Sequence, residues 1–398
     1  VIFWSLVFLI LFILSGITAS FVEGASDHHN LGELLPLWST LPFVGMLLSI
    51  ALFPLIKPHW WEHNMMKVVL FWSLAFLVPF GVAFGADAFL FNLLEIVVLD
   101  YLPFIVLLFG LYAVTGGIIL KGTLVGTPKV NMVLLLIGTL LASWVGTTGA
   151  SMLMIRPVIR ANQWRQRKKH ILVFFIFLVS NIGGALTPIG DPPLFLGFLR
   201  GVPFFWTMKL LPLMAVNVVI LLTVLFVMDT YYYKKELAEG RCPEDVLGDG
   251  PRQPLRVEGL HNLIFIGMII AGVILNGLLP NLEAFADQAT GEVYGVTLYH
   301  GIVVGYNSMI QMAAILLAAY LSLKLTKGQI REDNCFTWGC IKEVAILFIG
   351  IFITMIPALA LLKANGASLG LNSAAQFFWT TGALSSFLDN APTYLVFM

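Results

Sequence analysis

The segment SNIGGALTPIGDPP, residues 180–193, carries helix breakers, side-chain oxygens and a carboxylate between two strongly apolar runs. Unwound backbone persists in hydrocarbon only where protein surrounds it or where it lines a wet cavity. The break would free carbonyl oxygens to coordinate a cation, and Asn181 and Thr187 add side-chain oxygens. Glycine permits dihedral angles closed to other residues and lets a ligand approach the main chain. We expect that role of Gly183, Gly184 and Gly190.

The carboxylate of this segment has two interpretations. Asp191 precedes Pro192, and an aspartate before a proline is a favourable start for a helix. However, a charge at the centre of a bilayer costs ~2.5–3.5 kcal/mol on insertion scales, and such residues usually line substrate pathways. Serine or asparagine would cap the helix about as well without that cost, which favours a site for Asp191.

Two further segments have the same polar character. VGTTGASMLMIRP (145–157) supplies hydroxyls at a predicted hairpin tip, and GALSSFLDNAPTYL (382–395) again places a carboxylate shortly before a proline. A single hydroxyl in a membrane helix more often serves packing or helix–helix hydrogen bonding. Three clusters together favour a binding site, whose further members are Thr147, Thr148, Ser151, Ser385, Ser386, Asp389 and Asn390.

The composition indicates that these segments lie in a membrane protein. Of the 398 residues, 59% are hydrophobic and 11% charged, whereas a soluble domain has about 25% charged residues. The net charge of zero points to no nucleic-acid partner, and three cysteines without a CxxC pair do not indicate a disulfide framework. Stretches of ~20 apolar residues predict spans at 1–20, 37–56, 67–85, 102–120, 171–199, 206–232, 260–279, 299–323 and 341–362.

Basic residues predict the orientation of these spans. RANQWRQRKKH, residues 160–170, has five Lys or Arg and no acid, which places it in the cytoplasm. The other basic loops fall on the same side if residues 130–159 form a re-entrant hairpin that enters and leaves there. The acidic loop 281–297, which has no Lys or Arg, is then outside.

The fold class is therefore an all-α polytopic membrane protein with two inverted-topology repeats, each with a re-entrant hairpin and a broken transmembrane helix. Residues 1–20 fit either a first span or a cleaved signal peptide with ITAS as its cleavage zone. The expected divisions are 1–36 (this segment and an external loop), 37–233 (first repeat, with hairpin 130–159 and broken helix 171–199), 234–259 (cytoplasmic linker) and 260–398 (second repeat, with hairpin 370–398).

These motifs resemble those of a known family. SNIGGALTPIGDPP is similar to the signature of the ion transporter superfamily, in particular of NhaD-type sodium/proton antiporters and their arsenite-permease-like relatives. SSFLDNAPTYLVF resembles the second-repeat hairpin of that group, and TTGAS its first-repeat hairpin tip. The span order is similar over most of the chain, while the specific motifs occupy about fifty residues.

The resemblance implies a homodimer in a bacterial inner membrane, in which a transport part moves like an elevator against a scaffold part. It assigns the same clusters, from Thr147 to Asn390, to the ion site. The family has a second unwound helix after the second hairpin; here the sequence ends at Met398, so the second repeat is expected to be truncated at that end.

The predicted function is exchange of Na⁺, or Li⁺, for H⁺, without any cofactor. The two cations would compete for the same carboxylates, chiefly Asp389 and Asp191. Competition near neutral pH needs an aspartate pKa raised by about three units from ~3.9, a cost of ~4 kcal/mol that burial can supply. A carboxylate paired with Na⁺ or with H⁺ crosses the membrane near neutral, whereas an empty ionised site is penalised.

Two other functions stay open. In cation-coupled import of an anion such as citrate, a dicarboxylate or arsenite, the half-helices starting at Pro192 and Pro392 would face the anion with their positive ends. The aspartates just before those ends would repel it. An intramembrane aspartic protease fits less well, because PIGD lacks the first glycine of the GxGD pattern.

Some polar residues lie outside the clusters. His59 and His63 have the i, i+4 spacing of a metal site, although the adjacent tryptophans favour an interfacial anchor. Asn217 and Asn276 are expected to form helix–helix hydrogen bonds.

Overall fold

The computed structural model describes residues 31–241, 254–299, 301–365, 370, 373–386 and 390–397. Its contacts divide the chain into two compact units. Unit 1 comprises the described residues of Val1–Ile105, Leu279–Met309 and Trp338–Met398. Unit 2 comprises those of Val106–Leu278 and Ile310–Thr337.

Unit 1 is built mainly from long apolar helices. Its elements are α2 (Leu31–Leu34), the 3₁₀ helix η2 (Leu37–Thr40), α3 (Leu41–Ile56), α4 (Pro58–Glu95), the π-helical turn η3 (Ile96–Tyr101), η6 (Leu279–Asn281), β3 (Gly295–Tyr299), β4 (Ile302–Gly305), α15 (Gly339–Asn365), α16 (Ala374–Ser385) and α17 (Asn390–Phe397). The first residues of α5 (Leu102–Thr115) and α13 (Tyr306–Leu325) also belong to it.

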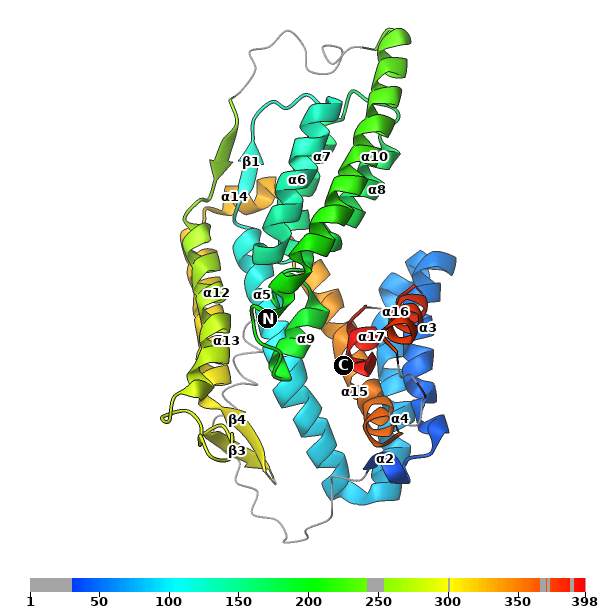
Figure 1. Ribbon diagram of the computed structural model, residues 1–398, viewed down its shortest axis with the longest axis vertical. Helices are drawn as coiled ribbons and strands as arrows, with labels where there is room; N and C mark the ends of the chain where they lie inside the picture. Colours follow the sequence, from blue (N-terminus) through cyan, green and yellow to red (C-terminus); the bar gives the residue numbers. More distant parts are fainter. Residues whose placement is uncertain are drawn as a thin grey trace. The chain divides into compact units, whose positions relative to one another are not determined.

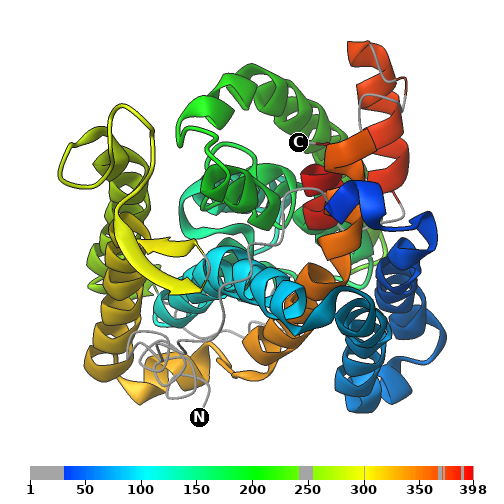
Figure 2. The ribbon, with the colours of Figure 1, turned by 90° about the horizontal axis from the view of Figure 1, so that it is seen from below.

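Helices α3, α4 and α15 form the core of unit 1. α4 packs against both of the others, and Figure 2 shows α3 and α4 side by side. Close packing depends on small residues: a Cβ on Gly350 would lie 2.7 Å from Val69 Cγ1. Between the π turn and α15, Tyr101 Oη donates a hydrogen bond of 3.0 Å to Ala345 O.

The chain reverses within α4 at a single glycine. Gly85 has φ +84°, a region that L side chains rarely adopt, so that the helix kinks there. Strands β3 and β4, which come much later in the chain, pair antiparallel. Tyr299 of β3 donates a hydrogen bond to Asp87, just after the kink. The side chain of Asp87 is therefore hydrogen-bonded to the pair of strands β3 and β4.

Unit 2 contains the polar segments of the first half of the chain. Its elements are the rest of α5, β1 (Ile119–Lys121), α6 (Pro128–Val145), α7 (Thr147–Ala161), α8 (Lys169–Leu178), the 3₁₀ turn η4 (Ile182–Gly184), α9 (Pro192–Leu199), η5 (Trp206–Leu210), α10 (Leu211–Ala238), β2 (Arg256–Glu258), α12 (Asn262–Leu278), the rest of α13 and α14 (Gly328–Asp333). Figure 1 shows α6, α7, α8 and α10 side by side, and α6 packs against each of the other three.

Hydrogen bonds between helices connect the remainder of unit 2. Asn276 of α12 donates to Gln311 of α13, as expected for a helix–helix contact. Asn217, in contrast, donates to Leu213 O in its own helix, so the prediction of a helix–helix bond was wrong there. Asn217 is exposed on α10, and a backbone carbonyl one turn away satisfies its amide.

Seven helical segments of the described chain are long and apolar enough to cross a membrane: Leu37–Ile56, Pro58–Thr115, Pro128–Val145, Trp206–Ala238, Asn262–Asn281, Tyr306–Leu325 and Gly339–Asn365. They bear out a mostly helical, multi-pass membrane protein. The predicted spans 67–85 and 102–120 lie in one helical run that kinks at Gly85. The predicted span 1–20 is outside the described residues.

Two short sheets were not predicted. β1 pairs antiparallel with β2, which lies in the segment expected to be a solvated linker, and β3 pairs with β4. Three- to five-residue strands in loops have too little alternation to be recognised in a sequence dominated by helical patterns.

Candidate functional site

The candidate site of unit 2 begins with the hairpin of α6 and α7. α6 starts at Pro128, preceded by Thr127, whose side chain caps the helix by accepting a hydrogen bond from Val130 N. It ends at Val145, and Gly146, with a φ of +78°, leads directly into α7. The two helices pack against each other and place TTGAS at the start of α7. Re-entry of this hairpin from one side of the membrane stays a prediction.

The broken helix lies beside this hairpin. α8 ends at Leu178 and α9 begins at Pro192, with turns and a short 3₁₀ helix between them, so the predicted interruption of segment 171–199 is present. In the break, Ser143 of α6 donates to Gly183 O and Thr187 donates back to Ser143 O. The unwound carbonyls and hydroxyls are therefore partly satisfied by the hairpin.

The first residue of α7 is bonded to the same break. Thr147 N donates a hydrogen bond of 2.9 Å to Gly190 O, and Ser151 Oγ lies 2.8 Å from Ser180 Oγ at the end of the first half-helix. The hairpin tip and the broken helix thus form one polar structure. It brings together the predicted residues Thr147, Ser151, Gly183, Gly184, Thr187 and Gly190.

The three glycines of the break lack the positive φ angles that would require glycine, while the approach of a ligand to their main chain stays a prediction. Gly183, Gly184 and Gly190 all lie outside the positive-φ region, so unusual dihedral angles do not explain them. Instead, a Cβ on Gly190 would lie 2.2 Å from Gly184 O, and one on Gly184 would lie 2.7 Å from Gly190 O. These positions need glycine because two main-chain segments pass in direct contact, which the sequence alone does not reveal.

Asp191 occupies the N-cap position of α9 without capping it. Its side chain makes no cap hydrogen bond; Leu194 N donates instead to its backbone oxygen at 3.1 Å. Pro192 and Pro193, at the first two positions of α9, have no N–H to offer. The half-buried carboxylate therefore does not serve as a simple helix cap.

The N-terminus of α7 differs from that of α9. In the described chain, Thr148 N and Gly149 N donate no backbone hydrogen bond, and the Thr148 side chain is exposed. Amide groups at a helix start favour negative charge. The two half-helices thus provide different chemistry: amide donors at α7, and a carboxylate at α9.

Other predicted site residues are placed separately. Asn181 is exposed in the break, whereas Thr187 is fully buried and its hydroxyl is used within the protein. In unit 1, Ser385 Oγ donates to Asn390 Oδ1 at 2.7 Å and Ser386 Oγ donates to Gly382 O at 2.8 Å. Asp389 lies outside the described residues, so its approach to Asp191 stays a prediction.

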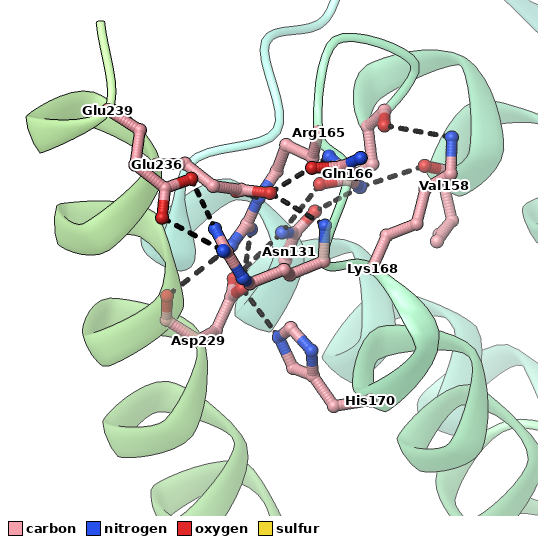
Figure 3. A network of polar contacts seen from close by, with 11 residues as sticks. Asn131, Val158, Arg165, Gln166, Lys168, His170, Asp229, Glu236 and Glu239 are labelled. Carbon is pink, nitrogen blue, oxygen red and sulfur yellow. Dashed lines mark hydrogen bonds and ion pairs between the residues drawn. The ribbon is translucent and has the colours of Figure 1, made fainter. Parts of the chain in front are cut away.

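A buried ion network lies where α7 meets α8 and α10, and it was missed by the sequence analysis (Figure 3). The side chain of Arg165 has no exposed surface and is paired with Asp229 and with Glu236, the latter at 3.0 Å. His170 Nε2 lies 2.8 Å from Asp229 Oδ1. Arg165, from the predicted cytoplasmic cluster, is thus a core residue.

Neutral groups complete this network. Asn131 of α6 donates to Asp229 at 2.8 Å and exchanges amide hydrogen bonds with Asn162, which directly follows α7. Backbone amides of Gln166 and Arg167 donate to Glu236 Oε1. A buried charge that is fully hydrogen-bonded avoids most of its desolvation penalty. The signal in the sequence was the spacing of Asp229 and Glu236, seven residues apart on one face of a mostly apolar helix.

Comparison with known proteins identifies the family. Residues 32–398 match the family described as "Putative citrate transport". The chain belongs to this citrate transport family. The comparisons with curated proteins and with solved structures give no match.

Membership of the citrate transport family agrees with the apolar helices and describes a transporter embedded in a membrane. It also agrees with a carrier rather than an enzyme. Among the alternatives raised by the sequence, cation-coupled transport of citrate fits the family better than Na⁺/H⁺ exchange, which the match does not support.

Proposed function

We propose that this protein is a cation-coupled carrier of citrate or of a similar di- or tricarboxylate. The observation that carries the proposal is the match of residues 32–398 to a citrate transport family. The geometry of unit 2 supports it, because amide donors and a carboxylate lie at neighbouring but distinct positions.

The hairpin tip would bind the anion. Thr148 N and Gly149 N lie at the positive end of α7, where a substrate carboxylate is stabilised by backbone donors and by the helix dipole. Thr148 is exposed and its hydroxyl can add one more donor. α9 is unsuited to this task, because its first two residues are prolines and Asp191 precedes them.

The carboxylate of Asp191 would bind the coupling cation, either H⁺ or Na⁺. Na⁺ is a hard ion that favours carboxylate and carbonyl oxygens, by analogy with other hard cations. The bond from Thr147 N to Gly190 O brings the start of α7 against the residue that precedes Asp191. A cation there would cancel the repulsion between Asp191 and a bound anion, so each solute would favour binding of the other.

Transport into proteoliposomes tests this function. With labelled citrate, we expect uptake that requires an imposed Na⁺ or proton gradient. Asp191→Asn should abolish the stimulation by the cation gradient, whereas Asp287→Asn, in the acidic loop, should leave it unchanged. Na⁺ flux driven by a pH gradient in the absence of any carboxylate would instead support an antiporter and reject the proposal.

A backbone substitution tests the anion site. Proline is tolerated in the first turn of a helix and removes one N–H donor. Thr148→Pro should therefore raise the KM for citrate by about tenfold or more, which equals ~1.4 kcal/mol or more of lost binding. Thr148→Ala keeps the N–H and should change KM much less. If both variants raise the KM for citrate equally, the backbone N–H of Thr148 does not bind the substrate.

A further inference from the structure

Three potential metal ligands converge at the start of α4, in unit 1. His59, Glu62 and His63 have the i, i+3, i+4 spacing that places side chains on one helical face. One ligand atom from each of them lies within 4.8 Å of the other two, and all three residues are exposed. The sequence alone showed only the spacing of the two histidines.

A hydrogen bond prepares His63 for a metal. Its Nδ1 lies 2.9 Å from the backbone oxygen of His59, which can only accept, so the bond requires a proton on Nδ1. The lone pair of the neutral ring is then on Nε2. Histidines that bind metals typically donate their other ring N–H to a carbonyl or carboxylate in this way, which fixes the tautomer and the ring orientation.

The distances leave room for an ion after small side-chain rotations. Bonds of ~2.0–2.1 Å in a tetrahedral site place ligand atoms about 3.4 Å apart. The imidazole rings of His59 and His63 have centroids 4.9 Å apart, and His59 Nδ1 lies 3.8 Å from Glu62 Oε2. Exposed side chains on a formed helix can close these gaps without moving the backbone.

We propose that His59, Glu62 and His63 bind a divalent transition-metal ion of the Zn²⁺, Cu²⁺ or Ni²⁺ class. Two imidazoles and one carboxylate suit these ions, whereas Mg²⁺ and Ca²⁺ prefer oxygen ligands only. The positive N-terminal end of α4 and the neighbouring Lys57 disfavour binding of a cation. The negative charge of the Glu62 carboxylate offsets this repulsion. This site shares no residue with the hairpin of α6 and α7 and does not depend on the proposed function.

Equilibrium binding to the purified full-length chain in detergent tests the proposal. Isothermal titration with Zn²⁺ should give one site per chain, and both His59→Ala and His63→Ala should weaken it at least tenfold. Glu62→Gln should weaken binding by a smaller factor, since its amide oxygen can still coordinate. Because all three side chains are exposed, the melting temperature without metal should not change in these variants.

Other histidines provide the matched control. His28 and His29, next to Asp27 in the sequence, are another close pair of histidines, so His28→Ala/His29→Ala is titrated in parallel. Its Zn²⁺ affinity should equal that of the unmodified chain. With one equivalent of Cu²⁺, electron paramagnetic resonance should show coupling to two ring nitrogens, reduced to one in His63→Ala. No binding, or loss only in the His28/His29 variant, would overturn the proposal.

Discussion

At the scale of single residues, the break between α8 and α9 is held by contacts that tolerate almost no added volume. Gly184 and Gly190 approach each other through their main chains, and the buried hydroxyl of Thr187 reaches Ser143 O in the hairpin. The same segment is polar enough to bind an ion and tight enough to keep its shape. Residues that fix the shape and residues proposed to bind a ligand are therefore interleaved in it.

Gly190→Ala should destabilise the protein. The new Cβ would lie 2.2 Å from Gly184 O, and overpacking of this kind typically costs ~1–3 kcal/mol. We expect a lower melting temperature and reduced citrate uptake. Gly267→Ala in α12, with nothing within 4 Å of its Cβ, is the control and should be neutral or slightly stabilising. Equal melting temperatures for Gly190→Ala and the unmodified chain would refute the contact.

Arg165→Ala should be among the most damaging substitutions in unit 2. It leaves the buried carboxylates of Asp229 and Glu236 without their cation, and breaking a buried pair in this way costs ~3–5 kcal/mol. Arg167→Ala, two residues away, removes a pair with Glu239 on the surface and should have a much smaller effect. Melting curves of both variants measure the difference. Similar losses would show that Arg165 is not a core residue.

At the scale of elements, short strands and a short helix are joined at one end of unit 2. Lys121 of β1 forms ion pairs of 2.8 Å with Glu258 of β2 and 2.7 Å with Asp333 of α14. Arg331 of α14 donates to Ala113 O of α5 at 2.7 Å, and its burial lowers the pKa of its guanidinium to about 10. Ion pairs thus stabilise the packing of β1, β2 and α14, which are too short to be stable on their own.

The pair of Lys121 and Asp333 predicts a dependence of stability on pH. Hydrogen bonds from Lys121 and then from Gln329 lower the pKa of Asp333 from its usual value of 3.8. A carboxyl with a lowered pKa stabilises the folded protein above pH ~4, and this contribution is lost as the pH falls through the folded pKa. Asp333→Asn should therefore lower the melting temperature at pH 7. At a pH below the folded pKa of Asp333, the variant and the unmodified chain should have the same melting temperature.

The neighbouring acid provides the comparison. Glu332→Gln changes an exposed side chain that forms no ion pair within the described residues, so at pH 7 its melting temperature should equal that of the unmodified chain. If Asp333→Asn and Glu332→Gln behave alike at pH 7, the ion pair with Lys121 does not contribute.

At the scale of the whole molecule, charge and helix length predict the arrangement in the membrane. Among the described residues, seven apolar helical segments are long enough to cross a bilayer, while basic residues gather in 160–170 and acidic residues in 281–297. The hairpin of α6 and α7 has two arms joined at Gly146, so its ends lie on the same side if the tip stops within the bilayer.

Labelling of single cysteines tests this topology. In a variant lacking Cys242, Cys335 and Cys340, a membrane-impermeant maleimide should reach Ala289→Cys from outside intact cells. Thr123→Cys and Gln163→Cys, which flank the hairpin, should react only after the membrane is opened. Labelling of one of these two from outside would show that the hairpin crosses the bilayer completely.

The sequence by itself determined that the protein lies in a membrane, that it is mostly helical and that a helix is broken between α8 and α9. Apolar length, charge bias and the Gly- and Pro-rich segment 180–193 are local properties, and the constraint that hydrocarbon cannot satisfy backbone groups makes them decisive. The same segment also showed where polar side chains would gather, because a charge such as Asp191 is costly in lipid unless it has a function.

Only the tertiary structure decided what each polar residue touches. It showed that Gly190 is needed for a main-chain contact, that Thr187 is fully buried and that Arg165 belongs to the core rather than to a solvated cluster. Such contacts join residues far apart in the sequence: Arg165 and Glu236 are 71 positions apart, and Tyr101 and Ala345 are 244 positions apart. They depend on how helices pack, and periodicity along the chain carries no information on which partner a side chain will meet.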